Sequence, residues 1–188
     1  MKAKSLRIAV RVMLPFAFQL MATAVDAQTV LIDEPFDFDI AGWNYFGGPE
    51  VIMRWDGAKG TPDPGSLQLS SKVELSDFSP LFEAMSECFP VSVGETFQLE
   101  AMVRANPRYR DSCFVSLIFF KGPNCSGQRN FYGNVPPSPP EVWKEDSLLV
   151  TVGTGNQSAR VSLSLYLSPP AGLTTCNFDS VTLTRDPQ

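Results

Sequence analysis

The segment Cys88–Arg104, CFPVSVGETFQLEAMVR, contains two runs of alternating side-chain character, separated by Gly94. Apolar side chains occupy every second position of the longer run: Phe97, Leu99, Ala101 and Val103. A period of two predicts a β-strand with one buried face and one exposed face. Glycine turns without the strain that a side chain would add, so Gly94 marks a corner before this strand. The segment therefore predicts a sheet with one face open to solvent or a ligand.

Similar apolar runs recur along the chain, and turns rich in glycine and proline separate them. The 16 prolines and 13 glycines supply these turns. About nine strands at a spacing of roughly eight to twelve residues, without a long helix, predict an all-β fold. We expect a two-sheet antiparallel β-sandwich with its core between the sheets. Residues 75–87 differ, because near-helical spacing is interrupted by Pro80, and we interpret them as an irregular segment that could include a helical turn.

Residues 1–27 have the pattern of a secretory signal peptide. Four basic residues open the segment, an apolar stretch follows over 12–24, and small residues near Ala27 suit cleavage. A membrane anchor is the alternative, but the stretch is short and contains Pro15 and Gln19. The sequence thus predicts a secreted or periplasmic protein whose residues 28–188 form a single β-sandwich domain with no further membrane segment.

Charge and composition narrow the function. Cleavage after residue 27 removes four basic residues and one acidic residue, which changes the net charge from −5 to −8. This acidic balance argues against nucleic acid and anionic lipid as partners. The chain has no histidine, so the usual general base and the Ser/His and Cys/His pairs are missing. We expect a non-enzymatic protein; a glycosidase that uses paired carboxylates, with Glu100 as one, is a distant alternative.

All four cysteines follow residue 27, and an even number in an exported chain predicts two disulfide bonds. Cys113 and Cys125 flank one strand and its turn, which suggests a local bridge between them. Counting alone leaves the other pairings open.

Short motifs in a fixed order carry a family resemblance. They are Phe36-Asp37, Gly42-Trp43, Gly65-Ser66-Leu67, Gly94-Glu95-Thr96-Phe97, Met102-Val103-Arg104, Trp143, Ala159-Arg160-Val161 and Phe178-Asp179-Ser180-Val181. This order resembles the jelly-roll carbohydrate-binding modules appended to bacterial cellulases and xylanases, which belong to the galactose-binding-like superfamily. The resemblance covers almost all of the chain after residue 27. It implies a jelly-roll sandwich, a bacterial source and polysaccharide as the partner.

The resemblance also implies two structural features. In the resembled fold the strands beside Cys88 and Cys176 adjoin, which implies a Cys88–Cys176 disulfide. The same modules hold a structural calcium ion with acidic residues that match Asp37 and Asp179 here. Calcium prefers several oxygen ligands of this kind. A solvated acidic edge is the alternative reading of Asp37 and its acidic neighbours.

The alternating strands also predict a ligand site. If the polar faces of three strands adjoin, they form a shallow groove that combines an aromatic wall with hydrogen-bonding groups, as a sugar site requires. The predicted binding residues are Gln98, Glu100, Arg104, Phe120, Ser164 and Tyr166. The leading hypothesis is an exported, non-catalytic domain that binds glycan on the open face of one sheet. The alternative is a structural or adhesive protein that binds protein partners, which an exposed apolar patch at Phe120, Ile118 and Met102 would favour.

Overall fold

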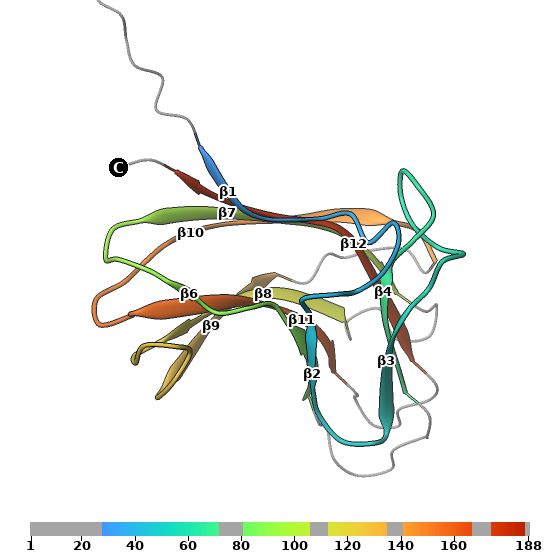
Figure 1. Cartoon of the computed structure of the whole chain (residues 1–188), viewed down its shortest axis with the longest axis horizontal. Helices are drawn as coiled ribbons and strands as arrows, with labels where there is room; N and C mark the ends of the chain where they lie inside the picture. Colours follow the sequence, from blue (N-terminus) through green and yellow to red (C-terminus); the bar gives the residue numbers. More distant parts are fainter. Residues whose placement is uncertain (1–27, 72–80, 106–112, 135–140, 167–173, 187–188) are drawn as a thin grey trace, which may run out of the picture.

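The computed structural model describes residues 28–71, 81–105, 113–134, 141–166 and 174–186, which form twelve β-strands and no helix within these ranges. The strands make two antiparallel sheets stacked as layers (Figure 1). The predicted all-β, two-sheet antiparallel sandwich of the jelly-roll type is therefore confirmed. The signal-peptide prediction for residues 1–27 lies outside the described residues. None of the described residues forms a helix with the length and apolar character needed to cross a membrane.

Sheet A has the strand order β10-β7-β12-β4-β3, and β1 pairs with β12 beyond the part that β4 occupies. Its strands are β1 (Thr29–Glu34), β3 (Val51–Trp55), β4 (Leu67–Ser71), β7 (Thr96–Ala105), β10 (Lys144–Thr151) and β12 (Thr175–Asp186). Sheet B has the order β2-β5-β11-β8-β9, with β6 paired to β11. Its strands are β2 (Asn44–Phe46), β5 (Leu81–Met85), β6 (Phe89–Pro90), β8 (Cys113–Phe120), β9 (Arg129–Asn134) and β11 (Ser158–Tyr166).

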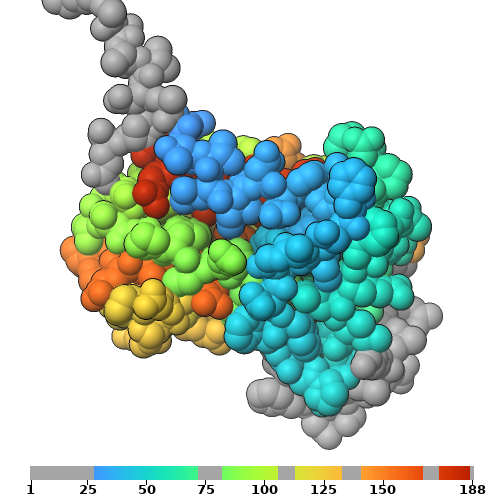
Figure 2. Space-filling view, viewed as in Figure 1, coloured from blue at the N-terminus to red at the C-terminus, as the bar shows by residue number. Residues whose placement is uncertain are grey.

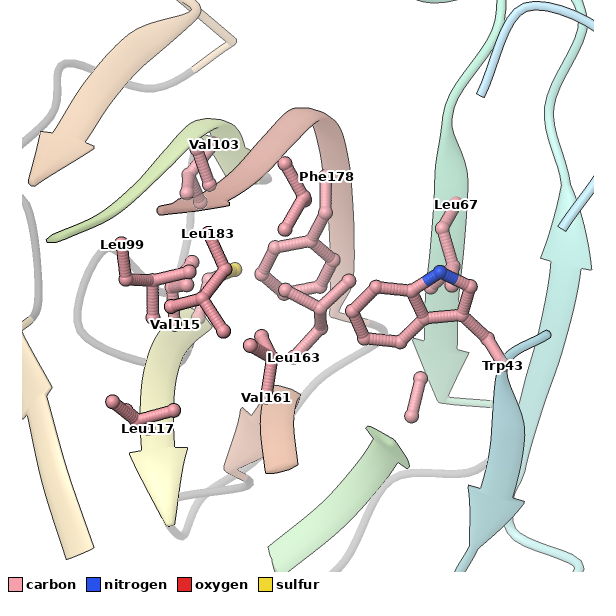
Figure 3. Packing of buried hydrophobic residues seen from close by; sticks show 14 of the residues in the cluster. Trp43, Leu67, Leu99, Val103, Val115, Leu117, Val161, Leu163, Phe178 and Leu183 are labelled. Atoms are coloured by element: carbon pink, nitrogen blue, oxygen red, sulfur yellow. The ribbon is translucent and has the colours of Figure 1, made fainter. Parts of the chain in front are cut away.

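The hydrophobic core lies between the two sheets, and the predicted alternation of β7 supplies part of it. Phe97, Leu99, Ala101 and Val103 are each at most 2% exposed, while the residues between them are partly exposed. Figure 3 shows Leu99 and Val103 of sheet A packed toward side chains of β8 and β11 in sheet B. Burial of each large apolar side chain contributes about 1.5–3 kcal/mol, so this interlayer packing is the main stabilising term.

The strand β5 corrects the prediction of an irregular segment at residues 75–87. Residues 81–85 form a strand that pairs with β11, and its successive side chains point to opposite faces of the sheet. Phe82 and Ala84 are buried in the core, whereas Glu83 faces outward beside Ser164. The near-helical spacing of apolar residues was misleading because Met85 packs on the outer face of the sheet instead of in the main core. Residues 72–80 lie outside the described residues.

The two disulfides exist, but both predicted pairings are wrong: Cys88 bonds Cys125, and Cys113 bonds Cys176. Cys113 opens β8 and Cys125 follows its end, and the seven residue steps from Cys113 to Phe120 alone span about 23 Å, far beyond disulfide reach. Cys176 lies opposite Ala105 in sheet A, whereas Cys88 precedes a residue bonded to β11 in sheet B. The pairing of Cys113 with Cys176 instead ties the two sheets together through the core.

Candidate functional site

The outer face of sheet B, called the B face below, is set by strand alternation. On β11, Val161, Leu163 and Leu165 are buried in the core, so Ser162 and Ser164 point to the opposite side. The B face consists of Phe46, Glu83, Met85, Phe114, Ser116, Ile118, Phe120, Arg129, Phe131, Arg160, Ser162, Ser164 and Tyr166. It combines aromatic rings with charged and hydroxyl groups.

An ion pair crosses the B face. Nη1 of Arg129 lies 3.2 Å from Oε2 of Glu83. The two residues belong to β9 and β5, and β8 and β11 lie between those strands. Glu83 is only 5% exposed and also accepts a 3.0 Å hydrogen bond from Oγ of Ser162. Because a buried carboxylate is costly unless its oxygens are paired, Arg129 and Ser162 fix the position of Glu83.

Arg160 has a different environment on the same face. Its guanidinium carbon lies 5.7 Å from the ring centroids of both Phe46 and Phe120. Nη1 contacts the sulfur of Met85 at 3.5 Å, and the buried Nε has no hydrogen-bond partner among the described residues. Burial lowers the pKa of the Arg160 guanidinium, and the nearby Glu83 carboxylate opposes that change. Arginine still keeps its charge at physiological pH, so Arg160 is a partly desolvated cation without an ion-pair partner among the described residues.

Exposed aromatic rings stand at both edges of the B face. Phe46 on β2 is 45% exposed and Phe131 on β9 is 44% exposed. These strands are at opposite ends of the order β2-β5-β11-β8-β9, and four strand spacings amount to about 19 Å. Tyr166 packs edge-on against Phe114 at 6.2 Å between ring centroids. The face therefore offers separated apolar platforms with charged groups between them, a suitable arrangement for an extended ligand.

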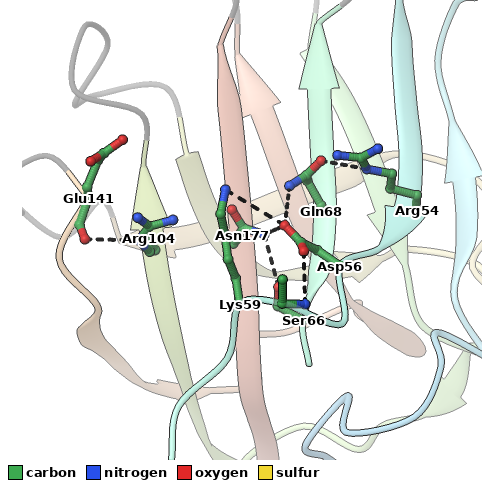
Figure 4. A network of polar contacts seen from close by, with 9 residues as sticks. Arg54, Asp56, Lys59, Ser66, Gln68, Arg104, Glu141 and Asn177 are labelled. Atoms are coloured by element: carbon green, nitrogen blue, oxygen red, sulfur yellow. Dashed lines mark hydrogen bonds and ion pairs between the residues drawn. The ribbon is translucent and has the colours of Figure 1, made fainter. Parts of the chain in front are cut away.

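The outer face of sheet A, called the A face, holds a hydrogen-bonded polar network (Figure 4). Gln68 and Asn177 are 2% and 1% exposed. Nε2 of Gln68 donates to Asp56 at 2.8 Å, and Nδ2 of Asn177 donates to Oγ of Ser66 at 2.9 Å. Nε of Arg54 donates to Gln68 at 2.8 Å. These groups satisfy one another, which fits a structural role.

The predicted binding residues divide between the two faces. Gln98, Glu100 and Arg104 lie on β7 in sheet A, where Arg104 donates a 2.9 Å hydrogen bond to the carbonyl of Glu141. Phe120, Ser164 and Tyr166 lie on strands of sheet B. The single groove expected from their union is therefore wrong. Alternation reveals which side chains leave the core, but it does not reveal which sheet a strand joins.

Sequence reasoning missed four residues of the B face: Phe46, Glu83, Arg129 and Arg160. Glu83 was hidden in the segment read as irregular. Arg160 had a usable signal, because it continues the outward alternation of Ser162 and Ser164 by one step. The pairing of Arg129 with Glu83 joins residues 46 positions apart, and nothing local in the sequence indicates it.

The residues proposed for calcium lie near the loop between β3 and β4. Asp179 is 1% exposed, and its oxygens accept hydrogen bonds from the N–H groups of Thr61 at 2.5 Å and Ser180 at 2.7 Å. Burial raises the pKa of Asp179 to about 6. The two N–H groups oppose this change, whereas the negative charges of Asp37 and Asp63 add to it. Asp37 and Asp179 are thus close enough to interact electrostatically.

The fit of this acidic site to calcium is incomplete. The described residues contain no group of three or more Asp, Glu, Cys or His side chains arranged to hold a metal. Oxygens that calcium would use already have partners: the Thr61 carbonyl accepts from Ser180, and the Phe36 carbonyl accepts from Trp55. Mutual repulsion among Asp37, Asp63 and Asp179 is the feature that a cation would relieve. Calcium therefore stays a prediction.

A cavity of about 310 Å³ lies between β1 and residues 86–89, with Trp43 and Phe89 among its lining residues. In the space-filling view it belongs to the region where the blue, cyan and green segments meet (Figure 2). Glu34 and Glu87 also line it, and burial raises the pKa of Glu34, with smaller contributions from Asp39 and Asp33. The cavity is separate from the B face, whose defining side chains are not part of its lining.

No protein-family model and no curated protein matches the chain. Solved structures with the same fold do. The CBM22-1 xylan-binding domain from Paenibacillus barcinonensis Xyn10C has a TM-score of 0.55 and 13% identity, with 86% of this chain and 97% of that chain covered. The CBM22-1 and GH10 modules of the Clostridium thermocellum xylanase Xyn10B have a TM-score of 0.59 and 14% identity, with 84% of this chain but only 29% of that chain covered.

The cleaved adhesin domain K1 of Lys-gingipain from Porphyromonas gingivalis W83 is also similar. Its TM-score is 0.53 at 13% identity, with 85% of this chain and 99% of that chain covered. The predicted resemblance to carbohydrate-binding modules is thus confirmed at the level of the fold. At these identities the likeness establishes the sandwich, and sandwiches of this kind serve several functions.

Proposed function

We propose that the chain is an exported, non-catalytic domain that binds glycan on the B face. The observation that carries this proposal is the placement of two exposed rings, Phe46 and Phe131, at opposite edges of a sheet with Glu83, Arg129 and Arg160 between them. Aromatic rings stack on the C–H faces of sugars, and charged side chains bond their hydroxyl groups. The similar fold of a xylan-binding domain supports the same function.

Export is part of the proposal. Both disulfides are of the kind that persists in oxidising compartments, and the pattern of residues 1–27 agrees with secretion. The surroundings of two described carboxylates bear on the proposal of a non-catalytic domain. Glu100 has Ser147 and Thr182 as its cross-strand neighbours, and Glu83 is held by Arg129 and Ser162. Glu83 is therefore not free to act as one of the paired carboxylates of glycosidic bond hydrolysis.

Affinity electrophoresis in gels that contain xylan, mixed-linkage β-glucan, galactan or pectin tests glycan binding. We expect at least one polysaccharide to retard the protein. Phe46→Ala and Phe131→Ala should each weaken the retardation about tenfold, equivalent to about 1.4 kcal/mol, because a stacking platform is lost. Phe38→Ala is the matched control, since Phe38 is 87% exposed and lies in the connection between β1 and β2. Unretarded migration in every gel would contradict the proposal.

The alternative of an adhesive protein with protein partners has less support from the described surface. The patch expected for it required exposed Ile118, Phe120 and Met102. Ile118 is 0% exposed and Phe120 is 7% exposed, because they pack with Met85 in a small cluster on the B face. Met102 lies on β7 in the other sheet. The similar fold of an adhesin domain keeps protein binding compatible with the architecture but does not favour it here.

We also propose that calcium binds beside Asp37 and Asp179 and has a structural role. Its support is the raised pKa of Asp179 and the neighbouring charges of Asp37 and Asp63, which a divalent cation would offset. Calcium at one hundred times its dissociation constant should stabilise the fold by about 2.7 kcal/mol. Thermal unfolding with calcium, and then with excess chelator, measures this. Asp37→Asn should abolish the calcium response. An unfolding midpoint of the wild type that is the same with calcium and with chelator would contradict calcium binding.

A further inference from the structure

We propose that the ligand of the B face is an acidic glycan and that Arg160 binds its anionic group. This inference rests on the proposed glycan-binding function and names the class of sugar. The relevant groups are a carboxylate, as in uronic acids, or a sulfate. Both present the paired oxygens that match the fork of an arginine side chain.

The strands of the B face carry one more positive charge than negative. Within the described bounds of the six strands of sheet B, the charged residues are Glu83, Arg129 and Arg160. Glu83 pairs with Arg129. One positive charge, that of Arg160, is therefore left over on this face of a chain whose net charge is −5. A surplus cation at the proposed binding face of an acidic protein calls for an anion in the ligand.

The guanidinium of Arg160 has weak contacts within the protein. The buried Nε has no hydrogen-bond partner among the described residues, and the contact of Nη1 is with the thioether of Met85. A thioether sulfur is a weak substitute for the anionic oxygens that a guanidinium prefers. Phe46 and Phe120 flank the guanidinium and keep water from part of it. A partly desolvated cation gains more from an anion than an exposed cation does, so occupation by an acidic sugar would satisfy Arg160.

Negative charge elsewhere on the protein would repel a polyanion at long range. The Debye length is about 8 Å at physiological ionic strength, so distant carboxylates are screened. The charged residues within the strands of sheet B sum to one positive unit. Phe46, on the edge strand β2, leaves the sugar ring an apolar platform 5.7 Å from the guanidinium carbon of Arg160. The anion and the ring of one acidic sugar can therefore be bound side by side.

The test compares two pairs of polymers that differ in charge and share a backbone. The pairs are polygalacturonate with its carboxyl-reduced form, and sulfated xylan with xylan. The full secreted chain is used, and affinity is measured by microscale thermophoresis. We expect the charged member of at least one pair to bind at least tenfold more tightly than its neutral member. The two pairs distinguish a carboxylate from a sulfate, and the preference should fall as sodium chloride is raised from 50 to 500 mM.

Arg160→Gln should bring the affinity ratio of the charged to the neutral polymer close to one, and Arg160→Lys should keep part of it, since lysine retains charge but lacks the fork. Arg104→Gln removes one positive charge from the A face and should leave the ratio unchanged. Equal binding of charged and neutral polymers would overturn this inference while glycan binding stands. Loss of the ratio in Arg104→Gln alone would also overturn it. Failure of all four polymers and of the neutral panel would overturn the proposed function as well.

Discussion

The two sheets of the sandwich share one core but carry opposite chemistry. Within their described bounds, the strands of sheet A contain seven carboxylates and four basic residues, whereas those of sheet B contain one carboxylate and two arginines. The same strands hold three aromatic residues in sheet A and ten in sheet B. On the A face the buried polar groups near β4 and β12 bond one another, whereas the B face leaves rings and a cation available.

This difference teaches that polar side chains on the outer face of a sheet do not by themselves mark a binding face. Gln68 and Asn177 on the A face are polar and conspicuous in Figure 4, yet each has a protein partner. Arg160 on the B face is less conspicuous in the sequence, yet its Nε has no hydrogen-bond partner among the described residues. Arg185 in sheet A also has a buried Nε without a hydrogen-bond partner among the described residues, but it pairs with Glu95. A cation without such an ion pair, beside exposed rings, is the stronger indication of a missing ligand.

The largest expected effect comes from the disulfide that joins the two sheets beneath both faces. Replacement of Cys113 and Cys176 by alanine should lower the free energy of unfolding by about 4 kcal/mol, given the 63-residue separation of the two cysteines. Urea denaturation measures this loss, and hydrogen exchange should show faster exchange in both sheets.

The bridge between Cys88 and Cys125 provides the comparison, since both cysteines flank strands of sheet B. Its removal should speed hydrogen exchange in β8 and β11 and leave β4 and β12 protected. Peptide mapping of the unreduced protein checks the connectivity. Recovery of a peptide that links Cys88 to Cys176 would refute the assignment of each bridge.

The second effect is a pH dependence that belongs to sheet A. The folded state holds the proton of Asp179 up to a pKa of about 6, whereas the unfolded chain releases it near 3.8. The folded state therefore binds more protons between these values, and the stabilisation present below pH 4 is lost as pH rises through 6. The loss is on the order of 2–3 kcal/mol.

Urea denaturation at a series of pH values measures this change. Asp179→Asn should lack this part of the slope, whereas Glu83→Gln in sheet B should keep it. Calcium requires the ionised carboxylate, so saturating calcium should reduce the loss above pH 6. A wild-type free energy of unfolding that rises steadily from pH 4 to 6 without calcium would contradict the raised pKa of Asp179.

The third effect compares one glutamate from each face. Glu83→Ala should cost roughly 2 kcal/mol, because it leaves Arg129 and Ser162 without their partner on the B face. Glu100→Ala on the A face should change stability by less than about 0.5 kcal/mol, since Glu100 is partly exposed. Chemical denaturation distinguishes the two. Similar losses would show that the ion pair across the B face contributes little.

Much of the fold was predictable because the signal is local. The alternation of Phe97, Leu99 and Val103 identified a strand and its buried side, and the structure buries all three. Leu163 and Leu165 follow the same alternation in the sequence, and both are fully buried. Strand β5 was not predicted because both of its sides carry apolar residues. Phe82 faces the core and Met85 packs on the B face, so this short strand shows no clear alternation.

The candidate site was less predictable because it depends on which strands become neighbours. Arg104 and Phe120 both sit on outward positions, but their strands belong to different sheets. The contact between Arg129 and Glu83 reaches across two intervening strands, and the disulfides follow the same long-range order. Alternation fixes the side of each strand, whereas the order of strands in a sheet arises from the packing of the whole chain.

The account depends most on the claim that the B face binds the ligand and the A face does not. NMR of labelled protein titrated with an oligogalacturonate tests this directly, because the Nε–Hε signals of Arg160, Arg129 and Arg104 report each face separately. The account predicts that the signals of Arg160 and Arg129 shift together with the backbone amides of Phe46 and Phe131, while Arg104 stays unchanged. Shifts at Arg104 and Glu100, with Arg160 unmoved, would contradict it.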